Sequence, residues 1–181
     1  TDRDFCRSLL NGQPFPAFPF SDPDWLGFIF NRDLHNAAGV STELFEALIA
    51  PVDASVAFEF TFVPALRPLK GAFDFPIAQL SDWDGYLNLI ASLPFCPEYY
   101  LLRTDGAVIL WFDPDAVVVG GTPDVMKSAA NHLGGMGALM RRSAEEFGVS
   151  LSDANSEIAT YIHNLAGRER DAGGPPSSIR S

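Results

Sequence analysis

The sequence predicts a single α+β domain in which a mainly antiparallel sheet of about four strands packs against helices. Three observations support this fold class. The apolar residues at 56–63 alternate with other residues, which is the two-residue period of a strand with one buried face. An Asp-Gly pair at 105–106 separates two more apolar runs, as in a β-hairpin. Helical apolar spacing occurs before, between and after these runs, with two or three helices expected at the C-terminal end.

The N-terminal region is expected to combine a helix with an extended, proline-rich segment. Residues 2–11 have the spacing of a helix with Phe5 and Leu9 on one face. The following segment, 12–20, reads GQPFPAFPF, and proline at this density excludes a helix or a central strand. We therefore expect an extended segment whose phenylalanines anchor it to the body of the domain.

Two helices are predicted between this segment and the first strand. Asp22 suits a helix cap and Pro23 suits a first turn, so a short helix is expected to follow them. The apolar side of that helix would consist of Trp25, Phe28 and Ile29. Ser41 suits a second cap, and the helix after it is predicted to run to about Ala50.

The segment 99–119 is predicted to be a three-stranded meander. A type I′ turn at Asp105-Gly106 would join strands at 99–104 and 107–112. This turn pairs Leu102 with Ile109, Tyr100 with Trp111 and Tyr99 with Phe112. Both faces of the hairpin are then largely apolar, so the sheet requires cover on both sides. A type I turn at 113–116 leads to a third strand at 116–119, which is expected to end at Gly120-Gly121.

Further helices are expected on both sides of the meander along the chain. One begins at Ser81, where Asp84 completes a capping box, and another is capped by Thr122. A third ends near Phe147, and Ser150 is predicted to cap the last helix.

Length and composition are typical of one domain with a sizeable core. The chain has 181 residues, of which 47% are hydrophobic. We expect a single α+β domain over 1–167, followed by a flexible Gly-, Pro- and Ser-rich tail at 168–181. No apolar run reaches the ~18 residues that span a bilayer, so no membrane partner is expected. No signal peptide opens the chain, but the first residue, Thr1, leaves open whether a leader was removed.

The two cysteines, Cys6 and Cys96, indicate a reducing compartment. They are too few and too far apart for a disulfide framework or a metal-binding motif. We expect two semi-buried thiols in a cytoplasmic protein. A single bridge in an exported protein is the alternative.

The net charge of −11 is concentrated in one part of the sequence. Between Gly71 and Val125, eight acidic residues accompany a single basic residue, Arg103. Such a field repels nucleic acid and anionic membranes and attracts basic proteins and cations. The Arg141-Arg142 pair precedes Glu145-Glu146. This order indicates a solvated helix face with i,i+4 pairing rather than a basic surface that binds nucleic-acid phosphates. The alternative role of the negative charge is solubility.

Three Asp-x-Asp pairs could bind a divalent cation, and each also has a structural role. The pairs are Asp22/Asp24, Asp82/Asp84 and Asp113/Asp115. Carboxylate oxygens are the ligands that Mg²⁺ and Ca²⁺ prefer. Over its three residues, Asp-x-Asp resembles the metal-binding element of many glycosyltransferases. Two pairs are expected at helix starts and the third in a turn, so no metal site is predicted from them.

The histidines do not form a known catalytic or metal-binding motif. His132 and His163 fall near predicted helix C-termini, where a partly positive imidazole suits the helix dipole. His35 lies in a predicted loop and could act as a general base, although no sequence motif identifies a nucleophile that it would activate.

What remains is an acidic surface that carries aromatic side chains. Trp83 lies between two aspartates, and Trp111 lies two residues before a third. Aromatic anchors ringed by charge are typical of protein interfaces. The alternative is that both tryptophans belong to the core. The predicted partner-binding residues are Asp82, Trp83, Asp84, Asp105, Trp111, Asp113 and Asp115.

The sequence thus favours a non-enzymatic binding module. The specific hypothesis is an acidic inhibitor or immunity-type protein of a bacterium, which neutralises a basic partner such as a toxin. It depends on the size, the concentrated negative charge and the lack of a catalytic signature. No cofactor and no catalytic residue are predicted. The alternatives are a metal-dependent hydrolase or transferase using Asp113, Asp115 and His35, and a structural subunit of a larger assembly.

Overall fold

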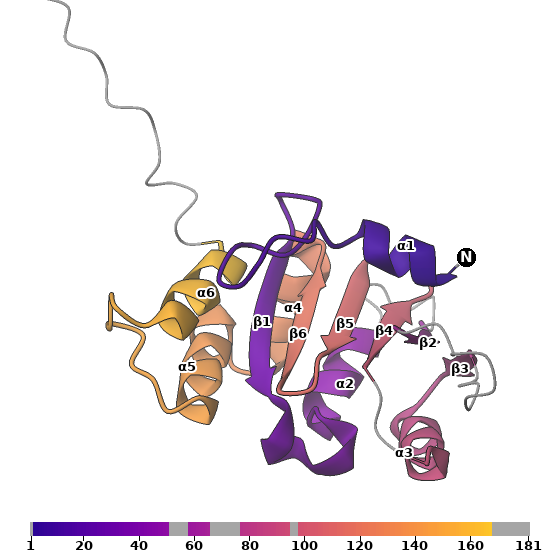
Figure 1. The fold of residues 1–181 in the computed structure, drawn as a ribbon. Coiled ribbons are helices and arrows are strands. Elements are labelled where there is room, and N and C mark those ends of the chain that lie inside the picture. The colour runs from indigo at the N-terminus through magenta and orange to yellow at the C-terminus, as the bar shows by residue number, and fades with distance from the viewer. Residues whose placement is uncertain (1, 51–57, 66–76, 95–97, 168–181) are drawn as a thin grey trace, which may run out of the picture.

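The computed structural model describes residues 2–50, 58–65, 77–94 and 98–167. The predicted tail at 168–181 lies outside these ranges, as do Cys96 and the first two residues of the predicted strand at 56–63. Within them, the chain is an α+β fold with one antiparallel sheet, which confirms the predicted class (Figure 1).

The sheet has six strands in the described part of the chain, in the order β1-β6-β5-β4-β2-β3. The predicted number, about four, was therefore too low, and the missed strands are β1 and β3. The bounds are β1 Leu26–Asn31, β2 Phe60–Pro64, β3 Ala78–Leu80, β4 Tyr99–Arg103, β5 Val108–Phe112 and β6 Ala116–Gly121.

The central meander follows the predicted register. Strands β4 and β5 pair Leu102 with Ile109, Tyr100 with Trp111 and Tyr99 with Phe112. Strand β6 then pairs antiparallel with β5, after a turn in which the Asp113 N–H donates to the Ala116 carbonyl over 2.9 Å. The prediction that Gly120-Gly121 ends the strand was wrong, because both residues pair with β1 and β5.

The short helix predicted after Asp22 is instead the edge strand β1. The Asp22 carboxylate accepts a hydrogen bond from the Asp24 N–H, 2.9 Å away, in a local turn rather than at a helix cap. Residues 27–30 are buried in succession. A short apolar run that is buried on both faces shows no alternation, so its sequence does not distinguish a strand from a helix.

Six α-helices and one 3₁₀ helix accompany the sheet in the described residues. The helix predicted after Ser41 is confirmed, and the Ser41 hydroxyl caps it. Two predicted caps were wrong: Asp82, one position after Ser81, caps α3, and Ser156, six positions after Ser150, caps α6. The bounds are α1 Asp2–Ser8, η1 Arg32–Ala38, α2 Thr42–Ile49, α3 Trp83–Ser92, α4 Pro123–His132, α5 Met136–Glu146 and α6 Glu157–Leu165.

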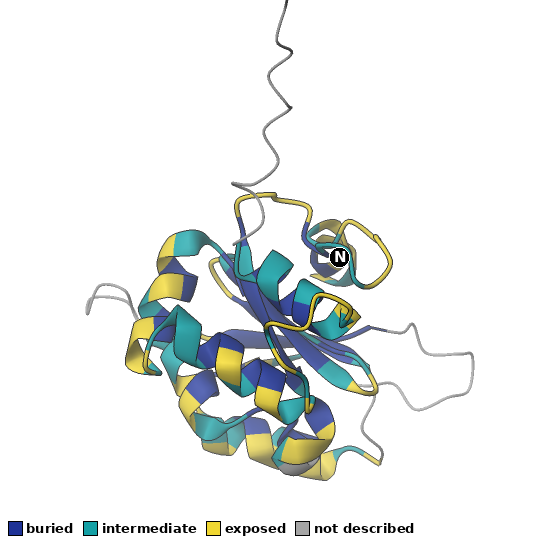
Figure 2. Ribbon diagram, turned by 90° about the vertical axis from the view of Figure 1, so that its left-hand side faces the viewer, coloured by how far each residue is buried: buried dark blue, intermediate teal, exposed yellow. Residues whose placement is uncertain are grey.

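One face of the sheet, here the helical face, packs against α2, α3, α4 and α5. Phe45 of α2 lies 5.3 Å from Phe60 of β2, measured between ring centroids, and Tyr86 of α3 lies 6.4 Å from Phe112 of β5. At the β1 end, the Arg142 guanidinium of α5 lies 5.7 Å from the ring centroid of Phe30. Figure 2 shows the strands as buried along most of their length, with exposed residues on the outer turns of the helices.

The opposite face, here the second face, carries Ile29, Tyr100, Leu102, Ile109, Trp111 and Val118. It is covered by α1, the segment 11–25 and α6. The Arg3 and Arg7 side chains of α1 donate to the carbonyls of Pro64 and Ala65 at the end of β2, over 2.8 and 2.9 Å.

Phe20 fixes the segment 11–25 onto the second face. A Cβ added to Gly120 would lie 1.9 Å from the Phe20 ring, and one added to Gly27 would lie 2.9 Å from it. The ring is 1% exposed, so it fills the space that these two strand glycines leave open. The predicted anchoring of the proline-rich segment by phenylalanine is thus correct for Phe20.

Replacing Gly120 by Ala is expected to lower the free energy of unfolding by about 1 to 3 kcal/mol, because the new methyl group overlaps the Phe20 ring. Phe20→Ala alone should cost about 3 to 5 kcal/mol through the cavity that it leaves. The double variant should be no less stable than Phe20→Ala, since the methyl group then enters vacated space. Urea unfolding measures all three, and a Gly120→Ala protein as stable as the wild type would contradict this packing.

Candidate functional site

A groove of about 830 Å³ lies on the second face, where its cover is incomplete. The floor consists of Ile29, Trp111 and Val118, which occupy neighbouring positions on β1, β5 and β6. One wall comes from Gln13, Phe15 and Pro19 of the segment 11–25, and the other comes from the start of α6. The groove is therefore a gap between two covering segments, with the sheet as its base.

Two aromatic residues meet at the walls of the groove. Phe15 of the proline-rich segment contacts Tyr161 of α6 edge-on, with 5.0 Å between ring centroids. The Phe15 side chain is 50% exposed, so part of its ring remains accessible at the wall of the groove. Burial raises the pKa of Tyr161, so its hydroxyl remains neutral near pH 7.

Trp111 belongs to the floor and is half-buried. Its indole Nε1–H donates to a carboxylate oxygen of Glu98, 3.1 Å away. This bond holds the orientation of the ring and uses its polar edge, so the apolar surface of the indole remains to line the groove. Trp111 is thus part of the sheet and part of the groove at the same time.

Asp113 and Asp115 lie on the rim of the groove, in the turn between β5 and β6. The Asp115 N–H donates to the Asp113 carboxylate over 3.4 Å, and the Arg32 guanidinium donates to the Asp113 carbonyl over 2.7 Å. Arg32 is itself 7% exposed, so the backbone of the turn is tied to a buried group. Glu157, the first residue of α6, adds a third carboxylate to the lining.

The structure does not place Asp82, Trp83 and Asp84 in the groove. They lie at the start of α3, on the side of the helical face. The Asp82 carboxylate caps α3 by accepting from the Gly85 N–H over 2.7 Å. Trp83 is half-buried and packs against Phe45, with 5.4 Å between ring centroids.

Asp105 lies at the other end of β5 from the rim and pairs with Arg103. The guanidinium of Arg103 donates to both Asp105 carboxylate oxygens, over 2.8 and 2.6 Å. It also donates to the Leu48 carbonyl over 3.0 Å and lies 4.1 Å from the ring centroid of Phe58. Arg103 is 1% exposed, so its charge depends on this carboxylate for compensation.

This pairing shifts the pKa of Asp105. Partial burial acts to raise the pKa, but hydrogen bonds from Arg103 and from the Ala107 N–H outweigh burial. The net effect is a pKa below the ordinary value of a carboxyl group.

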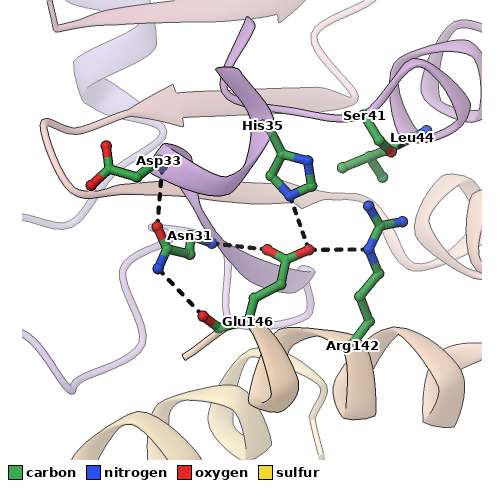
Figure 3. A network of polar contacts seen from close by, with 7 residues as sticks. All are labelled: Asn31, Asp33, His35, Ser41, Leu44, Arg142 and Glu146. Carbon is green, nitrogen blue, oxygen red and sulfur yellow. Dashed lines mark hydrogen bonds and ion pairs between the residues drawn. The ribbon is translucent and has the colours of Figure 1, made fainter. Parts of the chain in front are cut away.

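A second polar cluster joins β1 and η1 to the end of α5 (Figure 3). One oxygen of the Glu146 carboxylate lies 2.9 Å from Nε2 of His35 and 3.1 Å from Nε of Arg142. The other oxygen accepts from the Asn31 N–H over 3.0 Å. The expected i,i+4 pairing at the end of this helix is confirmed for Arg142 and Glu146. His35, considered above as a general base, has its Nε2 bonded to Glu146.

The described residues do not bring together a ligand set for a metal. In the ranges that the structure covers, no three His, Cys, Asp or Glu side chains are grouped so that they could hold an ion. Cys6 is fully buried, and burial raises the pKa of its thiol to about 12, so the thiolate is disfavoured. No helix among the described residues is long and apolar enough to cross a membrane.

Three residues of the groove were predicted from the sequence, and the rest of its lining was not. Trp111, Asp113 and Asp115 were predicted, whereas one wall comes from residues about 90 to 100 positions earlier in the sequence and the other from residues about 40 to 50 positions later. Phe15 was expected, with the other phenylalanines of its segment, to face the body of the domain. The edge-on contact between Phe15 and Tyr161 depends on how two remote segments dock.

Comparison of the chain with protein-family models, with curated proteins and with solved structures finds no match.

Replacing Asp105 by Asn is expected to lower the free energy of unfolding near pH 7 by about 2 to 3 kcal/mol, because Arg103 then stays buried beside a neutral amide. The folded-state pKa of Asp105 is lowered. The stabilisation is therefore complete above the unfolded pKa of about 4 and is lost as the pH falls through the folded value. Urea unfolding over this pH range should show the two proteins converging in acid. A difference that does not change with pH would contradict the pairing.

Millimolar Ca²⁺ or Mn²⁺ is expected to leave the melting temperature of the wild type within ~1 °C of its metal-free value, since a bound ion would stabilise the fold by mass action. Asp115→Asn should respond in the same way. A rise of several degrees in the wild type that Asp115→Asn abolishes would instead favour the metal-dependent alternative.

Proposed function

We propose that this protein is a non-enzymatic binding module that neutralises a basic protein partner through the groove on the second face and its carboxylates. In its specific form, it is an inhibitor or immunity-type protein that acts in the bacterial cytoplasm on a basic toxin. The partner is a protein, and neither nucleic acid nor a membrane is part of the proposal.

The observation that carries this proposal is an apolar groove with a carboxylate rim. Ile29, Trp111 and Val118 offer an apolar floor, and Asp113, Asp115 and Glu157 lie around it. Apolar area at the centre of an interface supplies affinity, while charges at the edge guide association and select the partner. A surface of this kind favours a partner that presents apolar and basic groups together.

The distribution of charge also favours a basic partner. The part of the sequence that contains β4, β5 and β6 carries almost all of its charge as carboxylates, with Arg103 as its single basic residue between Gly71 and Val125. Arg103 is buried and paired with Asp105, so it does not offset the exposed carboxylates at the rim. Long-range attraction of a basic protein to this region would speed encounter at low salt.

The test is affinity purification of the full chain, followed by binding measurements with each basic protein that it retains. Asp113→Asn/Asp115→Asn should weaken binding of the true partner by about ten-fold or more at low salt, because two rim charges are lost. The matched control is Asp22→Asn/Asp24→Asn, a second exposed Asp-x-Asp turn, which precedes the opposite end of β1. Both double variants change the net charge equally.

Equal weakening by the two double variants would contradict a specific role of the groove, since it would show an effect of net charge alone. Failure to retain any basic protein at low salt would contradict the proposed function itself.

A further inference from the structure

We infer that the groove receives an arginine side chain of the partner, with its guanidinium on the indole of Trp111 and paired with Asp113 and Asp115. This inference rests on the proposed function and specifies what the groove recognises. It commits to one occupant, an arginine flanked by apolar residues on a protein partner.

The groove has the size and the lining that such an occupant needs. Its volume of about 830 Å³ lies within the roughly 300 to 1,000 Å³ of sites that bury small molecules, and so holds a long side chain with a neighbouring residue. The lining is predominantly apolar, with Phe147 and Ile158 also contributing, and its acidic residues are Asp113, Asp115 and Glu157. An aliphatic stem can lie on the apolar part while a cationic head reaches the rim.

Trp111 provides the surface on which a planar cation stacks. The hydrogen bond of 3.1 Å from its Nε1–H to Glu98 holds the indole in one orientation before any partner arrives. Tryptophan is the best of the aromatic residues in cation–π contacts, which strengthen where water is excluded. A prepositioned ring also reduces the entropy lost on binding.

Asp113 and Asp115 provide carboxylates to the same groove from a turn whose backbone is held in place. Their turn is closed by the Asp113 N–H to Ala116 carbonyl bond of 2.9 Å and is tied to Arg32 through the Asp113 carbonyl. Trp111 and Asp113 are separated along the chain by Phe112 alone, which points to the helical face. The indole and the first carboxylate therefore leave the strand on the side of the groove.

Arginine fits this arrangement better than lysine. A guanidinium is planar, stacks on an indole and donates two parallel hydrogen bonds to a carboxylate. A lysine ammonium is a compact and strongly hydrated charge that makes neither contact as well. The groove should therefore distinguish the two residues, although they carry the same charge.

The test is a titration of the full chain with three tripeptides, each acetylated at one end and amidated at the other. Each has leucine at both ends and a different central residue, which is arginine, lysine or glutamine. The indole N–H resonance of Trp111 reports binding, and that of Trp25, which is 5% exposed, is the internal control. The arginine peptide should shift the Trp111 resonance and bind about five-fold or more tightly than the lysine peptide. The glutamine peptide should bind more weakly than both.

Three variants test the assigned contacts. Asp113→Asn/Asp115→Asn should reduce the affinity for the arginine peptide to that for the glutamine peptide, whereas Asp22→Asn/Asp24→Asn should leave it unchanged. Trp111→Leu should remove the preference for arginine over lysine. Because this variant lacks the indole resonance, binding is monitored through the backbone amide resonance of Val118. Unchanged melting of each variant confirms that it is folded.

The outcomes separate this inference from the proposed function. Equal binding of arginine and lysine peptides overturns the arginine assignment and leaves a basic partner in place. Binding of the glutamine peptide as tight as that of the arginine peptide, or no binding of any peptide, also overturns the assignment. In each of these cases, the affinity purification with the full chain still tests the proposed function independently.

The chain has arginines of its own that share this chemistry, at Arg168, Arg170 and Arg180. Replacing all three by Gln in the full chain distinguishes them from a partner. An unchanged affinity for the arginine peptide supports a partner as the source. A tighter affinity would show that these arginines compete for the groove and would overturn the partner assignment.

Discussion

The sheet is apolar on both faces, and this constraint governs how the rest of the chain is arranged. The helical face is covered by α2 to α5, which follow or precede the strands closely in sequence. The second face depends on segments from both ends of the described chain, α1 with the segment 11–25 and then α6. The Phe20 ring docks the N-terminal part because Gly27 and Gly120 leave no Cβ in its way. The two strand glycines thus leave the space that the Phe20 ring occupies.

The groove is a consequence of this cover. Where the segment 11–25 and α6 do not meet, Ile29, Trp111 and Val118 remain open to a ligand, next to the turn that carries Asp113 and Asp115. Buried arginines hold the two ends of β5 in different ways. Arg103 uses the carboxylate of Asp105, whereas Arg32 bonds to the backbone carbonyl of Asp113. At one end of β5 the Asp105 side chain therefore has a structural role, and at the other end the Asp113 side chain lies on the rim of the groove.

Much of the central fold could be predicted because it depends on local sequence. The Asp-Gly turn sets the register of β4 and β5, and the Asp-Pro-Asp turn sets the direction of β6. The helix cap at Ser41 and the end of α5 near Phe147 are likewise local. Strand β1 was missed because residues 27–30 are buried on both faces and show no period. Strand β3 has three residues, which is too short for a pattern to stand out.

The sequence by itself determined the α+β class, the meander and the acidic character of the strand ends, since turn chemistry, periodicity and charge belong to neighbouring residues. Only the tertiary structure decided which acids share a surface. It separated Asp82, Trp83 and Asp84 from Trp111, Asp113 and Asp115, and it paired Asp105 with the buried Arg103. It also brought Phe15 against Tyr161, from opposite ends of the described chain. The physical reason is that a groove exists where remote segments fail to cover an apolar sheet, and no local pattern records that gap.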